Sequence, residues 1–218
     1  MSVWAREKPR RRPVLSRDGI VDAAIRIADA EGLEAVSIRR VASDLGVRPM
    51  SLYTHIERKE DLLTLMRDRV NVEVLLGDEL PDDWRAALTG IARRTRDVVL
   101  RHRWMVEIHD APLGPNALRH LEESLTAVRP LNLDSVTGAE VLSAVDRFVM
   151  GHVSFEMTGH DVAKAKVGYL DELLASGEFP ELARAAADGA LNAGNSGPSF
   201  ERGLSWLLDG IEADVVKR

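Results

Sequence analysis

The segment 37–55 constrains the possible fold of this chain more than any other part of the sequence. Ser37 stands where a hydroxyl can cap the free N–H groups of a helix, and Gly46 stands where a left-handed backbone commonly ends one. Pro49 suits the first turn of a second helix, because its missing N–H would be unpaired there anyway. Between Ser37 and Gly46, apolar residues recur at the i, i+3, i+4 and i+7 spacing of a helix with one buried face: Ile38, Val41, Ala42 and Leu45. The segment therefore predicts two short helices joined by a tight turn.

The second of these helices has little apolar surface of its own, so its neighbours must hold it in place. Only Leu52 and Ile56 are available for burial. Upstream, an apolar stripe from Ile20 to Ala28 predicts a helix capped by Ser16, and downstream a longer helix is predicted from near Arg58. Three helices and the start of a fourth make a compact head, whose second short helix can present its outer face to the major groove of DNA. That face carries Arg48, Ser51, Tyr53, Thr54 and His55.

The distribution of charge agrees with a head that contacts DNA. The whole chain has a formal net charge of −6, but residues 1–70 hold 14 Lys and Arg against 11 Asp and Glu. The positive charge is densest between Arg6 and Arg17, where two prolines exclude a regular helix. We therefore expect residues 1–14 to form a basic, disordered arm that lies on phosphates or in the minor groove. The alternative is a solubilising tail or a tail that arises from the choice of start site.

The remainder of the chain reads as helices separated by proline and glycine, with no alternating strand pattern. We predict an all-α fold with three parts: the arm 1–14, a helix-turn-helix DNA-binding domain 15–74, and an effector-binding and dimerisation domain 75–218. A Gly/Asn/Ser-rich stretch at 190–199 is expected to be mobile. The helices predicted in the third part are Asp83–Arg101, Trp104–Asp110, Asn116–Val128, Ser135–Thr158, a loosely periodic one around Asp161–Ala175, Pro180–Ala187 and Phe200–Val216.

Several short motifs, in this order and spacing, resemble the tetracycline-repressor (TetR/AcrR) family of bacterial regulators. In the head they are Ile20-Val-Asp-Ala-Ala-Ile, Glu31-Gly32-Leu33, Ser37-Ile-Arg-Arg-Val-Ala, Leu45-Gly46-Val47, Leu52-Tyr53-Thr54-His55 and Lys59-Glu-Asp-Leu-Leu63. Beyond the head, a weaker likeness to the tetracycline-repressor type of regulatory domain rests on Arg103-Trp-Met-Val, Pro112-Leu-Gly-Pro-Asn116, Leu142-Ser-Ala-Val-Asp-Arg-Phe148 and Phe200-Glu-Arg-Gly-Leu204. The resemblance implies a ligand-responsive homodimer that binds a palindromic operator, in most cases as a repressor, and that a small molecule releases.

The DNA contacts of the family map onto nine residues of this sequence. Arg48 could form a bidentate contact with guanine or a phosphate contact, and Met50 could meet a thymine methyl group or cover Tyr53. Tyr53 and His55 would touch phosphate or pack on the surface of the head. Lys59 combines a positive charge with a helix N-terminus, which suits a phosphate oxygen. The full set is Arg39, Arg48, Pro49, Met50, Ser51, Tyr53, Thr54, His55 and Lys59.

By the same resemblance, the helices around 135–158 and 200–216 of two subunits form a four-helix dimer interface. The alternative is ordinary burial within one subunit. Gly203 and Gly210, two turns apart, would allow close helix approach. The stripes assigned to the interface are Val141, Val145, Phe148, Val149 and His152 on one helix, and Phe200, Leu204, Leu207, Leu208 and Ile211 on the other.

An effector pocket in the third part is expected to have a mostly apolar lining and to accept a hydrophobic or aromatic small molecule of unknown identity. Its candidate residues, taken from the topology of the family, are Trp84, Trp104, Met105, His109, Leu113, Phe148, His152 and Phe155. His109 falls where tetracycline repressors place a histidine linked to magnesium, but the positions of the acidic and polar partners hold Phe155 and Val74. We therefore expect no metal, no cofactor and no catalytic residue.

Two other functions compete with this one. One is a regulator that binds a protein partner and whose head no longer binds DNA; the intact Arg48, Tyr53, His55 and Lys59 argue against it. The other is an enzyme on a helical scaffold, for which no compact catalytic set is visible.

With no cysteine, no apolar run of membrane-spanning length and no secretory signal pattern, we expect a bacterial cytoplasmic protein, associated with the nucleoid when bound to DNA.

Overall fold

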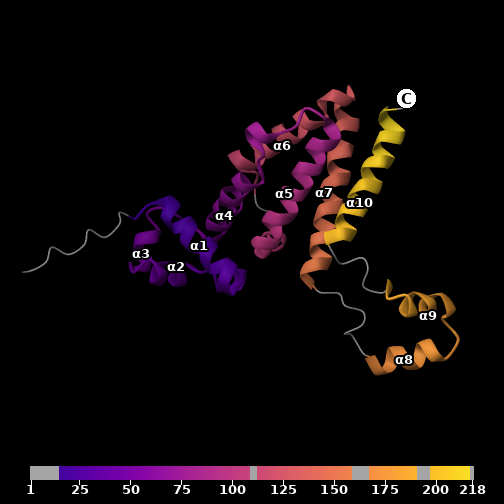
Figure 1. Ribbon diagram of the computed structural model, residues 1–218. Coiled ribbons are helices and arrows are strands. Elements are labelled where there is room, and N and C mark those ends of the chain that lie inside the picture. Colours follow the sequence, from indigo (N-terminus) through magenta and orange to yellow (C-terminus); the bar gives the residue numbers. More distant parts are fainter. Residues whose placement is uncertain (1–14, 109–111, 159–166, 191–196, 217–218) are drawn as a thin grey trace, which may run out of the picture. The chain divides into compact units, whose positions relative to one another are not determined.

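The computed structural model describes residues 15–108, 112–158, 167–190 and 197–216, and throughout these ranges the regular structure is helical (Figure 1). The prediction of an all-α fold is therefore confirmed. None of the helices in these ranges is long and apolar enough to cross a membrane. The α-helices are α1 (Arg17–Glu31), α2 (Ile38–Asp44), α3 (Pro49–Leu52), α4 (Lys59–Val74), α5 (Trp84–Arg101), α6 (Pro115–Val128), α7 (Ser135–Thr158), α8 (Val167–Ala175), α9 (Pro180–Ala187) and α10 (Gly197–Ile211).

The chain divides into two compact units, 1–66 and 67–218. Helix α4 runs through this division without a break, so it contributes its first half to one unit and its second half to the other. The domain boundary at residue 74 and the basic arm stay predictions, and the arm lies outside the described residues.

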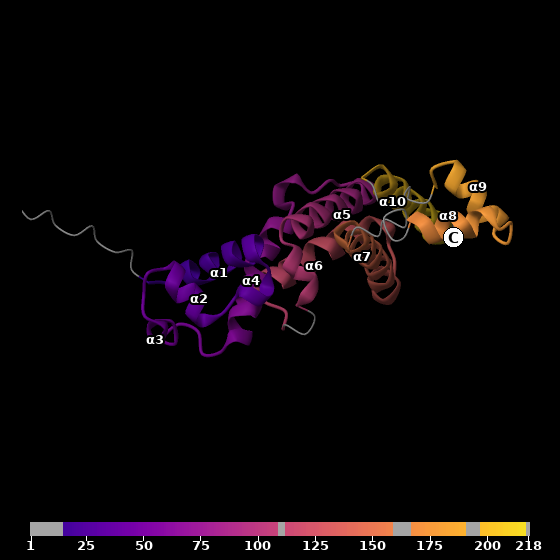
Figure 2. The same cartoon turned by 90° about the horizontal axis from the view of Figure 1, so that it is seen from below.

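The first unit is held together by apolar side chains from α1, α2, α3 and α4. Helix α1 packs against α2, and α2 against α3 (Figure 2). Leu52 of α3 and Ile56, which follows it, are both almost fully buried, as their spacing predicts. The remaining buried apolar residues of this unit are Ile20, Val21, Ala23, Ala24, Ile27, Ala28, Val36, Val41, Ala42, Leu62 and Met66.

The second unit has a core formed mainly by α5, α7 and α10, which lie side by side in Figure 1. Helix α10 runs antiparallel to α5, because Arg85 pairs with Asp209 whereas Arg93 pairs with Glu201. Helix α6 packs against both α5 and α7. The buried residues of this core are Ala87, Leu88, Ile91, Ala92, Val99, Ala127, Val128, Val141, Val145, Val149, Val153, Phe200, Leu204 and Leu208.

Most predicted helix ends agree with the structure, with four local differences. Helix α3 ends at Leu52, so residues 53–55 lie in a turn. The short helix predicted at 104–110 is a 3-10 helix at Arg103–Glu107, and residues 109 and 110 lie outside the described residues. The helix expected around 161–175 is described only from Val167. The last helix begins at Gly197 and its final turn, Glu212–Val216, is a π-helix.

The expectation of a mobile stretch at 190–199 is wrong for its last three residues, which are helical. Pro198 explains the difference, because in the first turn of a helix its missing N–H removes no hydrogen bond. Residues 191–196 of that stretch lie outside the described residues.

The two stripes assigned to a dimer interface are used within one chain. Phe200, Leu204 and Leu208 of α10 are each 1% exposed and pack with Val145 and Val149 of α7. A Cβ atom at Gly203 would lie 2.8 Å from the Phe148 ring, so this glycine allows α10 to approach α7 of the same subunit. The assignment of these buried residues to the interface is therefore wrong, and the alternative of burial within one subunit is correct for them.

Candidate nucleic-acid interface

The structure confirms the predicted helix cap and turn of the candidate recognition segment, residues 37–55. The Ser37 hydroxyl accepts a hydrogen bond from the Arg40 amide at 3.1 Å and so caps α2. Gly46 has φ of 65°, in the left-handed region where glycine carries no steric penalty. Arg48 then adopts an extended backbone, and Pro49 occupies the first turn of α3. The turn therefore brings α3 onto α2 with the Leu52 side chain fully buried beneath it.

Anchoring by one buried leucine leaves the rest of α3 and the following turn accessible. Met50 is 74% exposed and Tyr53 is 47% exposed, which is unusual for large apolar and aromatic side chains. The Thr54 hydroxyl donates to the Ser51 carbonyl at 2.8 Å, which stabilises the turn after α3. Of the nine predicted DNA contacts, Arg39, Arg48, Pro49, Met50, Tyr53 and Thr54 are exposed, and Ser51, His55 and Lys59 are half-buried.

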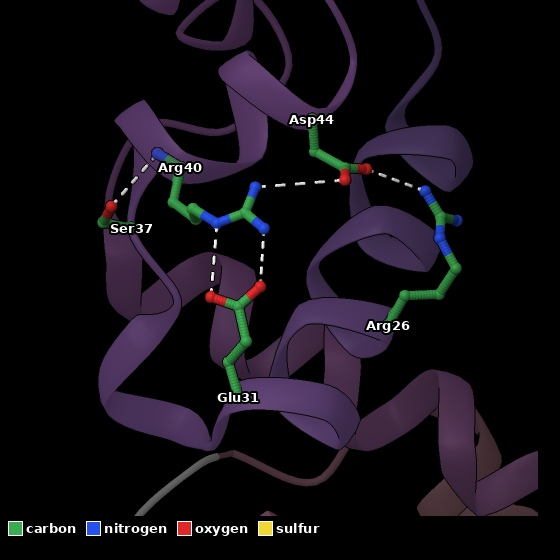
Figure 3. A network of polar contacts seen from close by, with 5 residues as sticks. All are labelled: Arg26, Glu31, Ser37, Arg40 and Asp44. Atoms are coloured by element: carbon green, nitrogen blue, oxygen red, sulfur yellow. Dashed lines mark hydrogen bonds and ion pairs between the residues drawn. The ribbon is translucent and has the colours of Figure 1, made fainter.

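The arginines of this unit fall into two groups, which the sequence alone did not separate. Figure 3 shows that Arg40 of α2 binds the Glu31 carboxylate of α1, with an N–O distance of 2.5 Å for the closer contact. Asp44 of α2 bonds Arg26 of α1 at 2.9 Å and lies 3.9 Å from Arg40. The hydrogen bond to Glu31, and then its charge, raise the pKa of Arg40. Arg26 and Arg40 therefore bind α2 to α1.

The second group of cations has no acidic partner among the described residues. Within the described residues, the side chains of Arg39, Arg48 and Lys59 form no ion pair. Arg39 and Arg40 are neighbours in sequence, yet a helix turns them by about 100° relative to each other, so only one of them faces α1. These three cations are among the nine residues predicted to contact DNA.

The start of α4 is less open to an anion than the sequence suggested. The Asp61 carboxylate accepts a hydrogen bond from the Arg58 amide at 3.1 Å, and its other oxygen lies 3.5 Å from the Arg58 guanidinium. One N-terminal amide of α4 is thus already satisfied by a side chain of the same chain. A phosphate contact at this helix would therefore depend on the Lys59 side chain more than on free backbone N–H groups.

The eight effector-pocket candidates of the second unit do not form one cluster. Trp84 is the first residue of α5 and Trp104 follows its last turn, so the 18 residues of this helix, about 27 Å, separate them by too much for both to line one drug-sized pocket. Leu113 is 60% exposed and Phe155 is 56% exposed, whereas Trp104 is fully buried. Trp84 and Met105 are half-buried against the core, and His109 lies outside the described residues.

The structure does bring Phe148 and His152 together, and it adds residues that the sequence reasoning missed. The rings of Phe148 and His152 lie 5.9 Å apart, and both contact the Phe200 ring, at 5.5 and 5.2 Å between centroids. Glu156 binds the Arg96 guanidinium at two points, 2.7 and 3.0 Å, with only a tenth of its side chain exposed. The i, i+4 spacing of His152 and Glu156, which places both on one face of α7, was the available sequence signal.

The described residues contain no group of three or more His, Asp or Glu side chains that could hold a metal ion. His102 follows the last residue of α5, whereas His120 is on α6 and His152 is on α7. His109 and His160 lie outside the described residues.

Comparison with known proteins gives two family matches. Residues 20–66 match the family described as bacterial regulatory proteins, tetR family, and residues 76–215 match the tetracyclin repressor-like C-terminal domain. The HTH-type transcriptional repressor DrrR1 of Streptomyces coeruleorubidus is 36% identical over 95% of this chain and 81% of that protein.

Solved structures agree with these matches. ActR of Streptomyces coelicolor in complex with (S)-DNPA is 32% identical, with a TM-score of 0.76 over 92% of this chain and 98% of that one. ActR in complex with actinorhodin is 29% identical, with a TM-score of 0.73 over 93% of this chain and 99% of that one. Both similarities cover the recognition segment and the helical unit beyond it.

Proposed function

This chain belongs to the tetR family of bacterial regulatory proteins, and from this premise we propose that its unpaired head cations bind a palindromic operator as part of a homodimer. Its function is that of a ligand-responsive, DNA-binding transcriptional repressor. The observation that carries the proposal is that Arg39, Arg48 and Lys59 stay unpaired around a segment anchored by Leu52.

The exposed side chains of the recognition segment suit different parts of a DNA duplex. Arg48, next to the start of α3, can reach a base edge, where its guanidinium could bind guanine O6 and N7 together. Arg39 on α2 and Lys59 on α4 would contact phosphates, which fix the register of the head on the duplex without reading sequence. Met50, exposed beside them, offers an apolar contact to a thymine methyl group.

A palindromic operator needs two heads, and we propose that the outer faces of α7 and α10 join two subunits. After the buried stripes are set aside, α10 still exposes Trp206 (68%) and α7 still exposes Phe155 (56%). Gly151 of α7 and Gly210 of α10 have no atom within 4 Å of a Cβ position, so each leaves a flat patch on its helix. Large aromatic residues beside small ones allow close packing of helices from a second copy.

For the effector, we propose a largely apolar, aromatic small molecule that binds in the second unit. ActR, which is similar over nearly the whole chain, has been solved with (S)-DNPA and with actinorhodin. In this chain the Phe148, His152 and Phe200 rings, beside the Arg96–Glu156 pair, combine aromatic surface with a few polar groups, as small-molecule sites do.

The family is one of transcriptional regulators, which are not enzymes, and we extend this to the chain itself. The proposed cycle needs no covalent step. An effector that binds better to a head spacing unfit for successive major grooves shifts the population away from the DNA-bound form. Because its target is chromosomal DNA, we place its action in the bacterial cytoplasm.

The experiment that tests this function is selection of bound duplexes from a random DNA pool, with the affinity of the selected sequence then measured against salt concentration. We expect a palindrome with half-sites about one helical turn apart, and an affinity that falls steeply with salt because counterions are released from the phosphates. A pool that stays random would contradict DNA recognition and would favour the partner-binding alternative.

A further inference from the structure

Met50 differs from the other methionines that the structure describes in being openly exposed to solvent. It is 74% exposed, whereas Met66 is fully buried and Met105, Met150 and Met157 are half-buried. Methionine is among the residue types that folded proteins most often bury. The thioether of Met50 is therefore the sulfur atom that a reagent in solution reaches most easily among those of the described residues.

The geometry of α3 separates Met50 from the packing of the head. Met50 and Leu52 are two residues apart, so a helix turns their side chains by about 200° relative to each other. Leu52 is fully buried beneath α3, and Met50 accordingly faces outward. The Thr54 hydroxyl, which donates to the Ser51 carbonyl at 2.8 Å, holds the turn that follows. A chemical change at the end of the Met50 side chain therefore alters the outer surface of the recognition segment and leaves its anchor in place.

The sulfur chemistry of this chain belongs to its methionines, because the sequence has no cysteine. A hydroperoxide such as hydrogen peroxide oxidises a thioether by two electrons. The sulfur lone pair attacks one peroxide oxygen, an S–O bond forms, the O–O bond breaks, and the second oxygen leaves as water. The product, methionine sulfoxide, is polar where the thioether was apolar. Methionine sulfoxide reductases reverse the step: two thiols become a disulfide and the sulfoxide oxygen leaves as water.

We propose that Met50 is a reversible oxidation site, and that its oxidation by a hydroperoxide weakens binding of the operator by the recognition segment. This inference rests on the proposed function, in which Met50 offers an apolar contact to a thymine methyl group. In the free protein the sulfoxide oxygen is hydrated. Bound against a methyl group it loses that water and gains no donor, which costs free energy.

The experiment compares the operator affinity of one protein before and after oxidation. Full-length wild type is treated with hydrogen peroxide until peptide mass spectrometry shows that Met50 is converted, and binding of the selected palindrome is measured by fluorescence anisotropy. We expect about tenfold weaker binding, the scale of one buried polar group without a partner. Treatment with a methionine sulfoxide reductase and a dithiol should restore the affinity.

Two leucine variants identify the methionine that is responsible. Met50→Leu removes the sulfur and keeps an apolar side chain of similar size, so its affinity should be the same before and after peroxide. Met150→Leu makes the same change at a half-buried position of α7, and it should lose affinity as the wild type does. Each protein is compared with itself, so a different starting affinity of Met50→Leu does not affect the result.

The free energy of unfolding distinguishes this effect from damage to the core. Oxidation of the fully buried Met66 would place a polar group among apolar side chains and destabilise the head. Oxidation confined to Met50 should leave the denaturation midpoint of the wild type unchanged. A midpoint that falls together with the affinity would attribute the loss to unfolding and overturn the inference.

Other outcomes also decide against the inference. An unchanged operator affinity once Met50 is converted would overturn it, as would an equal loss in Met50→Leu. If Met50→Leu binds no operator, protection replaces that comparison: bound operator should slow the conversion of Met50 and not that of Met150, and equal slowing would overturn the inference. If the wild type selects no palindrome, the proposed function itself fails, whereas a selected palindrome bound equally well after oxidation overturns this inference alone.

Discussion

The carboxylate of Asp68 lies where a side chain at Gly114 would have to begin. This contact joins α4 to the first residue before α6, across a long separation in sequence, and it couples two requirements. Position 68 needs a short acceptor that can reach two amides, and position 114 needs a residue without a Cβ atom.

We therefore expect Gly114→Ala to lower the free energy of unfolding by about 1–3 kcal/mol, because the new methyl group must displace a hydrogen-bonded carboxylate. Chemical denaturation of the two proteins measures the difference. Gly138→Ala, in helix α7, is the control. A Cβ atom at Gly138 would lie 3.8 Å from Val128, which is an ordinary van der Waals contact. That variant should be as stable as the wild type or more so, since alanine favours helix over glycine by about 1 kcal/mol.

We expect alanine substitutions of the unpaired arginines Arg48 and Arg39 to affect operator binding in different ways. Arg48→Ala should weaken binding of the selected palindrome by about 1–3 kcal/mol and relax the preference at one base pair. Arg39→Ala should weaken binding to all sequences alike and reduce the salt slope by about one, because it removes a phosphate contact. Fluorescence anisotropy titrations at several salt concentrations measure both quantities. Arg94→Ala, which removes an arginine paired with Glu79 in the second unit, should change neither.

The proposed dimer surface predicts different effects for truncation of two nearby residues of α10. Trp206 is exposed, so Trp206→Ala should weaken subunit association about tenfold or more and leave the subunit folded. Leu208 is 1% exposed, so Leu208→Ala should instead lower the free energy of unfolding by about 2–5 kcal/mol. Analytical ultracentrifugation and chemical denaturation separate the two effects. Unchanged association in Trp206→Ala would exclude this face of α10 as the interface.

His120 on α6 predicts a dependence of stability on pH. Burial lowers its pKa, against an opposing effect of the Glu123 and Asp146 carboxylates. The unfolded chain therefore takes up the proton first, near a pKa of about 6.5, and the free energy of unfolding should fall as the pH drops below that value. Denaturation at about pH 7.5 and about pH 5.5 measures the loss, which should be smaller in His120→Gln. An identical loss in both proteins would mean that His120 titrates alike in the folded and unfolded states.

Much of the head could be predicted from the sequence because its determinants are local. Ser16 and Ser37 cap α1 and α2 as predicted, each through a hydrogen bond to an amide three residues later. Gly46 ends α2 with a positive φ, and Pro49 begins α3. These features act within a few residues of the chain, so the printed sequence contains nearly all the information that they need.

The candidate effector site could not be predicted in the same way. Periodicity identified Phe148 and His152 as members of an apolar stripe, but it could not place Arg96 beside them, because Arg96 is on α5 and those two residues are on α7 with Glu156. Nor could it tell that the stripe at Phe200 packs within its own subunit.

The sequence by itself determined most of the helix ends of this protein, and which segment forms the recognition head, because caps, turns and helical periodicity are short-range effects. Only the tertiary structure decided which of the adjacent Arg39 and Arg40 is neutralised, which apolar stripe is buried, and that Asp68 caps a helix 48 residues away. Those outcomes depend on contacts between distant residues, and such contacts exist only once the helices have packed.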